Sequence, residues 1–352
     1  MKDILIAPNT TIREAMKLLD KTSQGCLVVV DDEEKLLGTL TDGDLRRAIL
    51  AGNGFSISIQ SIYNKNPYTL KIAAYTKEEA ENLLRTKKVN LIPIINSDNR
   101  VVDLITWSLF DGVESSYKGK NIGQVPVVIM AGGKGTRLEP FTKILPKSLI
   151  PIHDEPIIEH IIKRFIAIGC QDYYLTVNYK SRIMKAYFEE LNPDYEVHFI
   201  EEQEPLGTAG SLRFLIEKLD EPFFVTNCDI IVKSDYASLY EFHVKNDYDV
   251  TLVASAKEYT IPYGTCELNR SGYLSHINEK PTYELLVNAG LYVLNPDVLS
   301  IIPKNKFYHI THMIEDLKKA GKKIGVFPID DDAWIDIGQW AVYQKAVEQL
   351  EL

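Results

Sequence analysis

The 352-residue sequence has no long apolar run and no excess of basic charge. No apolar stretch approaches the roughly 18 residues that a membrane-spanning helix needs, and the N-terminal residues lack the apolar core of a signal peptide. The net charge is −10, with both signs interspersed. These absences argue against a membrane anchor and against nucleic acid or an anionic membrane surface as the main partner, and we expect a cytoplasmic protein.

Cysteine is also scarce. The four cysteines, Cys26, Cys170, Cys228 and Cys266, stand far apart, and none belongs to a C-x-x-C motif. This spacing gives no sign of a zinc site or a redox pair, so we expect each cysteine to pack as a small apolar residue. The remaining composition, 45% apolar and 25% charged, is typical of a globular protein of roughly two domains.

The first third of the chain contains an internal repeat. TIREAMKLL, which begins at Thr11, aligns with TKEEAENLL, which begins at Thr76, and the same offset of 65 residues pairs CLVVVDDEEKLLGTLT with LIPIINSDNRVVDLIT. Each copy predicts a Thr-capped helix, a strand, a polar turn, a second strand and the start of another helix. Neither copy buries its apolar face alone, so we expect the copies, residues 1–60 and 61–118, to pack together.

A different pattern follows a polar linker at residues 119–124. From Val125 onward, short apolar runs such as VPVVIM, DYYLTV and PFFVTN alternate with helical segments such as PIIEHIIKRFIAIG and GSLRFLIEKL. Strands that alternate with helices indicate βαβ units and a mostly parallel sheet. The sequence therefore predicts an α/β domain over residues 125–352.

The first of these strands runs into a glycine-rich string, AGGKGTRLEPFTKILPKSLIPI (131–152). Glycines let backbone amides approach an anion, and ligands of open α/β sheets bind beyond the carboxyl ends of the strands. The string lacks the GxxxxGK[ST] of a P-loop, and Leu138 stands where the dinucleotide fingerprint needs its third glycine. Spacing alone leaves a phosphate-binding loop and a glycine-rich surface turn as alternatives.

The full string resembles the signature of sugar-1-phosphate nucleotidyltransferases. Later segments resemble the same family in the same order, namely EPLGTAGSL (204–212), TNCDI (226–230), PYGTC (262–266), NEKP (278–281), VNAGLYVL (287–294) and WIDIGQW (334–340). The resemblance covers essentially all of residues 125–352. It implies a Rossmann-like, GT-A-like mixed sheet, and an enzyme that transfers a nucleotidyl group from an NTP to a sugar 1-phosphate and releases pyrophosphate.

The implied reaction needs no general base, because the attacking phosphate is already ionised at pH 7. Catalysis must then come from positioning and from neutralising charge on phosphate oxygens. The resemblance assigns these tasks to Arg137, Lys147, Asp229 and Lys280, with Arg137 gripping the leaving pyrophosphate. It assigns Asp229 and Asp336 to a magnesium ion as cofactor.

The resemblance also assigns the substrate contacts. The nucleotide is expected to contact Ala131, Gly132, Gly133, Gly135, Thr136, Glu202, Gly207 and Thr208. The sugar is expected to contact Gly264, Glu279 and Asn288. Guanine offers two adjacent donors to a carboxylate such as Glu202, whereas uracil and thymine offer one, which favours GTP. UTP, dTTP and CTP remain alternatives, and glucosamine 1-phosphate or another hexose 1-phosphate is the expected acceptor.

GTLTDGDLRRAI (38–49) in the first repeat resembles the GxxTxxD motif of CBS domains, which occur as tandem βαββα repeats and sense adenosine nucleotides. The resemblance assigns Thr41 and Asp44 to the ribose and phosphates. The second repeat departs from the motif, with Asp103 in place of the glycine and Leu109 in place of the aspartate. We therefore expect at most one good nucleotide site; the alternative is a pair that binds nothing and only mediates dimerisation.

Two function classes follow from these motifs. The first is an enzyme that makes an NDP-sugar as a homodimer or higher homo-oligomer, with the CBS pair for regulation or assembly. The second is a non-catalytic nucleotide sensor whose transferase domain has lost activity. The second class would lack Arg137, Lys147, Asp229 or Asp336, and all four are present.

Overall fold

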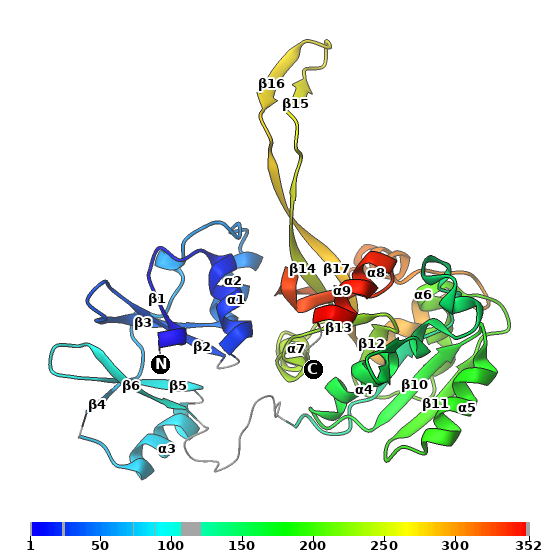
Figure 1. Cartoon of the computed structure of the whole chain (residues 1–352), viewed down its shortest axis with the longest axis horizontal. Helices are drawn as coiled ribbons and strands as arrows, with labels where there is room; N and C mark the ends of the chain where they lie inside the picture. The colour runs from blue at the N-terminus through cyan, green and yellow to red at the C-terminus, as the bar shows by residue number, and fades with distance from the viewer. Residues whose placement is uncertain (1, 23–24, 73, 88, 107–120, 350–352) are drawn as a thin grey trace. The chain divides into compact units, whose positions relative to one another are not determined.

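The computed structural model describes residues 2–22, 25–72, 74–87, 89–106 and 121–349 (Figure 1). The chain divides into two compact units. The first comprises Met1–Ser116, Ser255–Val287 and Pro328–Asp332, and the second comprises Tyr117–Ala254, Asn288–Phe327 and Ala333–Leu352. Leu109 and residues 119–120 of the expected linker lie outside the described residues. Where the chain is described, no helix is both long and apolar enough to cross a membrane.

The first repeat forms a three-stranded sheet covered by two helices. Its elements are β1 (Leu5–Ile6), α1 (Ile12–Thr22), β2 (Cys26–Val30), β3 (Leu36–Thr41) and α2 (Asp42–Leu50). The sheet order is β1-β2-β3, with β1 parallel and β3 antiparallel to β2. Every residue of β2 is buried, as expected for a central strand whose sequence is a continuous apolar run.

The second repeat builds the same sheet. Its elements are β4 (Leu70–Lys71), α3 (Lys77–Lys87), β5 (Leu91–Ile95) and β6 (Val101–Thr106), in the sheet order β4-β5-β6. The strand pairing is again parallel and then antiparallel. Both repeats carry a register shift at the equivalent place, Val29/Val30 in the first and Ile94/Ile95 in the second.

The two repeats are joined by a symmetric pair of backbone hydrogen bonds. The amide of Leu36 donates to the carbonyl of Asn99 at 2.9 Å, and the amide of Val101 donates to that of Glu34 at 3.0 Å. These four residues are related in pairs by the same 65-residue offset as the sequence repeat. The expectation that the copies pack together is confirmed by these contacts.

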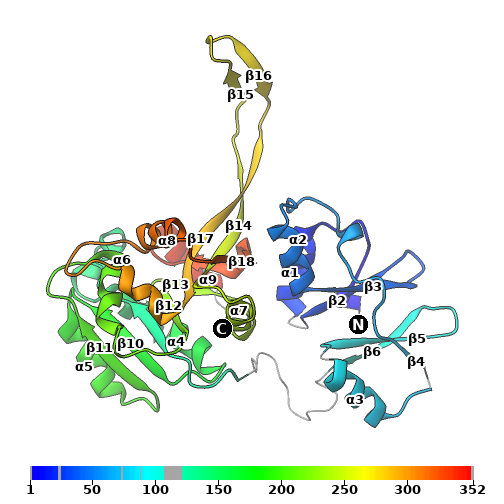
Figure 2. The ribbon, with the colours of Figure 1, turned by 180° about the vertical axis from the view of Figure 1, so that it is seen from behind.

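The segment Ser255–Val287, which we call the arm, belongs to the first unit. It is built from the end of β14 (Val250–Thr260), from β15 (Thr265–Leu268) and β16 (Leu274–Asn278), and from the start of β17 (Thr282–Leu294). β15 and β16 form an antiparallel ribbon that continues beyond β14 and β17 (Figures 1 and 2). Its large side chains are open to solvent, with Tyr263 74% and Tyr273 73% exposed. The ribbon therefore has no core of its own.

A seven-stranded mixed sheet carries the second unit. Its order is β11-β10-β7-β12-β17-β14-β18, and the strands not yet introduced are β7 (Val127–Met130), β10 (Asp172–Val177), β11 (Glu196–Glu201), β12 (Phe223–Asn227) and β18 (Ile324–Asp330). β11, β10, β7 and β12 run parallel, whereas β17 runs antiparallel to β12. The predicted α/β fold with a mixed sheet is confirmed.

Helices and short strands complete the second unit. The helices are α4 (Ile157–Ile166), α5 (Ser181–Leu191), α6 (Gly207–Gly210), α7 (Tyr236–Lys245), α8 (Ile310–Lys319) and α9 (Trp340–Gln349). Two small ribbons pair β8 (Pro151–Ile152) with β9 (Glu155–Pro156), and β13 (Ile230–Val232) with β19 (Trp334–Asp336). Of the helix predicted over GSLRFLIEKL (210–219), only Gly210 is α-helical, as the last residue of α6, and Ser211–Leu215 form a 3-10 helix.

Three of the four cysteines are buried and one is exposed. Cys26, Cys170 and Cys228 are buried, and burial raises the pKa of each thiol to about 12. Cys266 is exposed, contrary to expectation. It lies on β15, where the ribbon offers no interior in which to bury it.

Candidate active site

The candidate site lies at the carboxyl end of β7, in the middle of the parallel strands. β10 flanks β7 on one side and β12 on the other, so the chain leaves β7 where the strand order reverses. Such switch points are where open α/β sheets bind ligands. The glycine loop follows β7 directly, and the amide of Ala131 still donates to the carbonyl of Thr176 at 2.9 Å.

The glycines of this loop are needed for space and conformation. Gly135 has φ +67°, and a Cβ there would meet Thr142 at 2.9 Å and Lys147 at 3.0 Å. A Cβ on Gly132 would meet Oε1 of Glu202 at 3.0 Å, whereas Gly133 faces open space. Thr136 begins the 3-10 helix Thr136–Leu138, which also carries Arg137. The carboxylate of Glu202 therefore lies against the backbone at Gly132, whereas the backbone at Gly133 has open space beside it.

Two aspartates and a lysine converge on one point of the second unit. Nζ of Lys147 forms an ion pair with Oδ2 of Asp229. A Cβ on Gly338 would lie 2.7 Å from Oδ1 of Asp336, 2.8 Å from Oδ2 of Asp229 and 3.0 Å from Nζ of Lys147. Two carboxylates so close to one point, with a cation beside them, form a donor set suited to a divalent cation and phosphate oxygens.

The backbone holds the two aspartates together. β13 and β19 pair antiparallel, with Ile230 opposite Asp336, and the amide of Ile337 donates to the carbonyl of Asp229 at 2.9 Å. The amide of Gly338 also donates to Oδ1 of Asp336 at 2.9 Å. Residues more than a hundred positions apart therefore share one rigid ribbon, which fixes the separation of the carboxylates.

A cavity of about 310 Å³ opens beside these carboxylates, lined by Arg137, Asn227, Asp229, Ile230, Asn288, Ala289, Gly290, Tyr292, Trp334 and Asp336. Nδ2 of Asn288 donates to the hydroxyl of Tyr292 at 2.8 Å, and its Oδ1 accepts from the amide of Gly290 at 3.0 Å. The structure thus brings together Arg137, Asp229, Asp336 and Asn288 of the expected residues. Asn227, Tyr292, Trp334 and Gly338 were not singled out, although each lies within a motif used for the resemblance.

Glu202 is buried and beside the glycine loop. Its Oε2 accepts from the amide of Leu206 at 3.0 Å. Burial raises the pKa of this carboxyl, against the lowering effect of that amide. A buried carboxylate with one oxygen turned toward the loop can accept hydrogen bonds from a ligand, as a base-reading role requires.

Gly207 and Thr208 are engaged with the start of α8. Gly207 has φ +79°, and a Cβ there would meet the carbonyl oxygen of Tyr308 at 2.7 Å. The hydroxyl of Thr208 accepts from the amide of Ile310 at 3.0 Å. These contacts account for both residues by packing, and they leave the expected nucleotide contacts as predictions.

The other expected sugar residues and Lys280 belong to the arm. A Cβ on Gly264 would lie 3.0 Å from Oε2 of Glu279, so these two residues are neighbours. Lys280 has φ +46° and is exposed, as is Glu279. All three are in the first unit, whereas the cavity belongs to the second.

The expected CBS residues form a helix cap. Asp44 Oδ2 accepts from the Thr41 hydroxyl at 2.6 Å and from the Thr41 amide at 2.9 Å, and together they make a capping box at the start of α2. Asp44 also lines a second cavity of about 280 Å³, together with Arg47, Ala48, Asn53, Ser61 and Ile62. The motif therefore has a structural role at the cap, and its aspartate faces space for a ligand.

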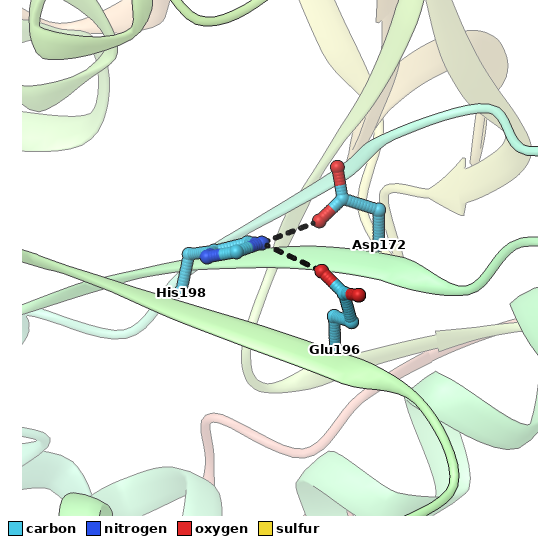
Figure 3. A group of neighbouring side chains, drawn as sticks. All are labelled: Asp172, Glu196 and His198. Carbon is cyan, nitrogen blue, oxygen red and sulfur yellow. Dashed lines mark ion pairs between the residues drawn. The ribbon is translucent and has the colours of Figure 1, made fainter.

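A third polar group lies at the opposite end of the sheet, where β10 and β11 begin (Figure 3). Nε2 of His198 lies 2.9 Å from Oδ1 of Asp172 and 3.5 Å from Oε2 of Glu196, and its ring stacks on Tyr174. Burial raises the pKa of Tyr174 to about 12, with Asp172 adding to the effect. In the described part of the chain these three side chains alone have the spacing of a three-residue metal site. Because these side chains are partly exposed and remote from the carboxyl-end loops, we interpret them as a surface ion-pair cluster.

Comparisons with known proteins agree with this geometry. A family model described as nucleotidyl transferase matches residues 126–351, and that of the CBS domain matches residues 1–51. The chain is similar to mannose-1-phosphate guanyltransferase from Yarrowia lipolytica, at 35% identity over 222 residues, which are 60% of each protein. The same-named protein of Hypocrea jecorina is 37% identical over 221 residues, again 60% of each. The chain thus spans about 60% of the length of the curated relatives it matches.

Solved structures give the same result. HddC from Yersinia pseudotuberculosis is 27% identical, with a TM-score of 0.51, over 65% of this chain and 100% of that one. Its complex with GMP-PN is 26% identical, with a TM-score of 0.50, over the same shares of both chains. Nucleotidyl transferases of this kind typically use a divalent metal. The matches confirm the resemblance inferred from the motifs, and the chain belongs to the nucleotidyl transferase family.

Proposed function

We propose that this protein transfers GMP from GTP to a hexose 1-phosphate and releases pyrophosphate. One observation carries the proposal: Asp229, Asp336 and Lys147 converge beside a cavity that Arg137 also lines, at the carboxyl end of the sheet. Membership of the nucleotidyl transferase family supports the reaction class. The names of the relatives and the GMP-PN complex support guanine over uracil, thymine or cytosine.

The chemistry follows from charge. A phosphate oxygen of the sugar 1-phosphate attacks the α-phosphorus of GTP, a new P–O bond forms, and the bond to the β-phosphate oxygen breaks. The nucleophile is largely a dianion at pH 7, so no protein base is required. Arg137 would bind the departing pyrophosphate through paired N–H groups, and Lys147 would balance charge on the transferred phosphate.

Asp229 and Asp336 would hold a magnesium ion, which supplies positive charge to the phosphate oxygens when bound. The donor set fits this role, because the carboxylates of Asp229 and Asp336 meet at one point, with the cation of Lys147 beside them. Lys147 would then exchange part of its ion pair with Asp229 for a phosphate contact. The open loop at Gly133 would let backbone amides approach the nucleotide.

For the acceptor, we infer a hexose 1-phosphate that Asn288 of the cavity contacts. Gly264, Glu279 and Lys280 of the arm remain predicted acceptor contacts, from the resemblance of their motifs. The names of the relatives support mannose 1-phosphate, and glucosamine 1-phosphate remains a candidate. We further infer that Thr41 and Asp44 serve an adenine-nucleotide site at the CBS pair. A homodimer or higher homo-oligomer is our proposal for the assembly.

The test is pyrophosphate release by the full chain with Mg²⁺, each of GTP, UTP, dTTP and CTP, and a panel of hexose 1-phosphates. We expect turnover with GTP, and a loss of at least about a hundredfold in kcat for Asp229→Asn and Asp336→Asn. Asp297→Asn, at an exposed carboxylate of the 3-10 helix Pro296–Ile301, should leave kcat unchanged. A folded protein that releases no pyrophosphate across the panel would instead be a non-catalytic sensor.

A further inference from the structure

Glu284, on β17, is the centre of a set of contacts within the first unit. Its carboxylate accepts from the amide of Phe55 at 2.8 Å and from the hydroxyl of Ser56 at 2.8 Å. A Cβ on Gly54 would lie 3.0 Å from Oε2 of the same carboxylate. A loop of the first repeat thus closes around one side chain of the arm, and Gly54 leaves the room for it.

Arg13, at the start of α1, lies beside this carboxylate. Its Nη1 donates to the carbonyl of Ala256 at 3.1 Å, and its Nε lies 3.0 Å from Oε1 of Glu258. Nη2 lies 3.9 Å from Oε1 of Glu284, and the guanidinium stacks 5.2 Å from the ring centre of Phe55. The side chain of Arg13 is only 17% exposed, so its charge is shared between both strands of the arm in a protected place.

Apolar packing reinforces these polar contacts. Ala256 of β14 is 1% exposed and belongs to the core of the first repeat. Outside the arm, Lys17 on the same helix forms an exposed ion pair with Asp332 of the segment Pro328–Asp332 at 2.9 Å. The base of the arm is therefore docked on the first repeat by burial, by hydrogen bonds to a carboxylate and by an arginine between two strands.

Beyond this docked base, the arm is an exposed ribbon. A two-stranded ribbon without a packed face is marginal in water, and the residues toward the tip of the arm are exposed. Lys280 and Glu279 stand four and five residues before Glu284. β17 begins at Thr282, so both residues precede the strand, and even a fully extended chain would put them at most roughly 13–17 Å from the docked point. Between them and Glu284, the carbonyl of Pro281 accepts from the amide of Ile261 at 3.0 Å, so the two sides of the arm stay paired from the docked point to Pro281.

We propose that Glu284 and Arg13 are positioning residues for the transferase, which order the arm that carries Glu279 and Lys280, the predicted sugar 1-phosphate contacts. The inference rests on the proposed function, because it takes the acceptor role of Lys280 from there. It gives the first repeat a task in the basal reaction, as the anchor of an arm that has no core. Neither residue is proposed to touch substrate; both act through β14 and β17, the strands at the base of the arm.

Steady-state kinetics and hydrogen–deuterium exchange of the full chain test this inference together. Glu284→Ala should raise the KM for the sugar 1-phosphate about tenfold, because charge-assisted hydrogen bonds to the loop are lost, and should leave the KM for GTP within about twofold. Arg13→Ala should act in the same direction. Glu284→Gln keeps one acceptor oxygen and should recover part of the loss. Peptides within 255–287 should exchange faster in Glu284→Ala than in the wild type.

The matched control is Glu267→Ala. Glu267 lies on β15 near the tip, where its Oε1 accepts from Nδ2 of Asn278 at 3.2 Å, a hydrogen bond within the ribbon. This variant should keep both KM values. Equal changes in both KM values for Glu284→Ala, or an unchanged KM for the sugar 1-phosphate, would overturn the inference. Hydrogen–deuterium exchange does not depend on turnover. If the wild type is inactive but the arm exchanges faster in Glu284→Ala, the proposed function fails and the docking role stands. If the arm exchanges equally in both proteins, the docking role fails.

Discussion

At the scale of single residues, Gly338 shows how tightly the candidate metal site is built. A Cβ at this position would lie only 2.7 to 3.0 Å from side-chain atoms of Asp336, Asp229 and Lys147, which leaves no room for it. The observed positions of the two carboxylates therefore require a glycine at position 338. The sequence signal was present, since Gly338 is part of WIDIGQW, but a glycine in a motif does not tell which atoms surround it.

We expect Gly338→Ala to lower kcat by about a hundredfold, because the methyl group must push at least one carboxylate or the lysine aside, and a displacement of about 1 Å costs this much in a positioned site. Circular dichroism and thermal unfolding should show a folded protein. Gln339→Ala is the control, since this neighbouring side chain is exposed and the change only removes atoms. Wild-type kcat in Gly338→Ala would contradict the geometry described for Asp229 and Asp336.

Glu202 leads to a prediction about pH. Burial raises the pKa of its carboxyl, so the protonated form persists above the ordinary glutamate pKa of about 4.3. If the carboxylate reads guanine, the KM for GTP should rise as the pH falls from 7 toward that raised pKa, because a protonated carboxyl loses an acceptor. By the same linkage, the burial penalty lowers the free energy of unfolding above the raised pKa and is relieved below it.

A KM–pH profile for GTP, measured between pH 5 and 8, checks this prediction. Glu202→Gln should show a higher KM for GTP and should lose this part of the profile, because its amide does not titrate. The KM for the sugar 1-phosphate serves as the internal control in both proteins. An identical profile in Glu202→Gln would remove Glu202 from base recognition.

At the scale of secondary structure, the sequence predicted the repeated helices and strands but not the contacts between residues far apart in the chain. The 65-residue offset predicted two equal sheets, and even their register shifts coincide. The run VPVVIM predicted a buried strand, and β7 is buried throughout. Periodicity carries such information because each residue's environment is set by its neighbours on the same strand or helix.

Contacts between distant polar residues had no such signal. Glu284 and Phe55 are 229 positions apart, and in the sequence Glu284 is one more charged residue in a polar segment. The helix over GSLRFLIEKL was overestimated for a related reason: the segment has helical spacing, but the amides of Ala209 and Gly210 donate to the carbonyl of Tyr308 at its start, and a 3-10 helix follows. Tertiary hydrogen bonds decided both cases, and no local pattern encodes them.

At the scale of the whole molecule, the front third has a ligand-sized cavity and a contact to the arm, joined by one loop. Asn53 lines the cavity of Asp44, and its Nδ2 donates to the carbonyl of Ala48, another lining residue, at 2.8 Å. The next three residues are the ones that close on Glu284. A ligand that shifts Asn53 would therefore act directly before the residues that contact Glu284.

The final prediction tests this link in the full chain, with AMP, ADP and ATP as separate probes. A nucleotide that binds should change the KM for the sugar 1-phosphate about fivefold or more and leave the KM for GTP unchanged, because the loop leads to the arm and coupling between sites is typically of this size. Asp44→Ala should abolish the effect by removing the ligand contact. Glu284→Ala should abolish it while calorimetry still detects binding. A nucleotide effect that persists in Glu284→Ala would exclude the loop as the route, and the absence of heat with all three probes would leave the CBS pair with anchoring of the arm and assembly as its tasks.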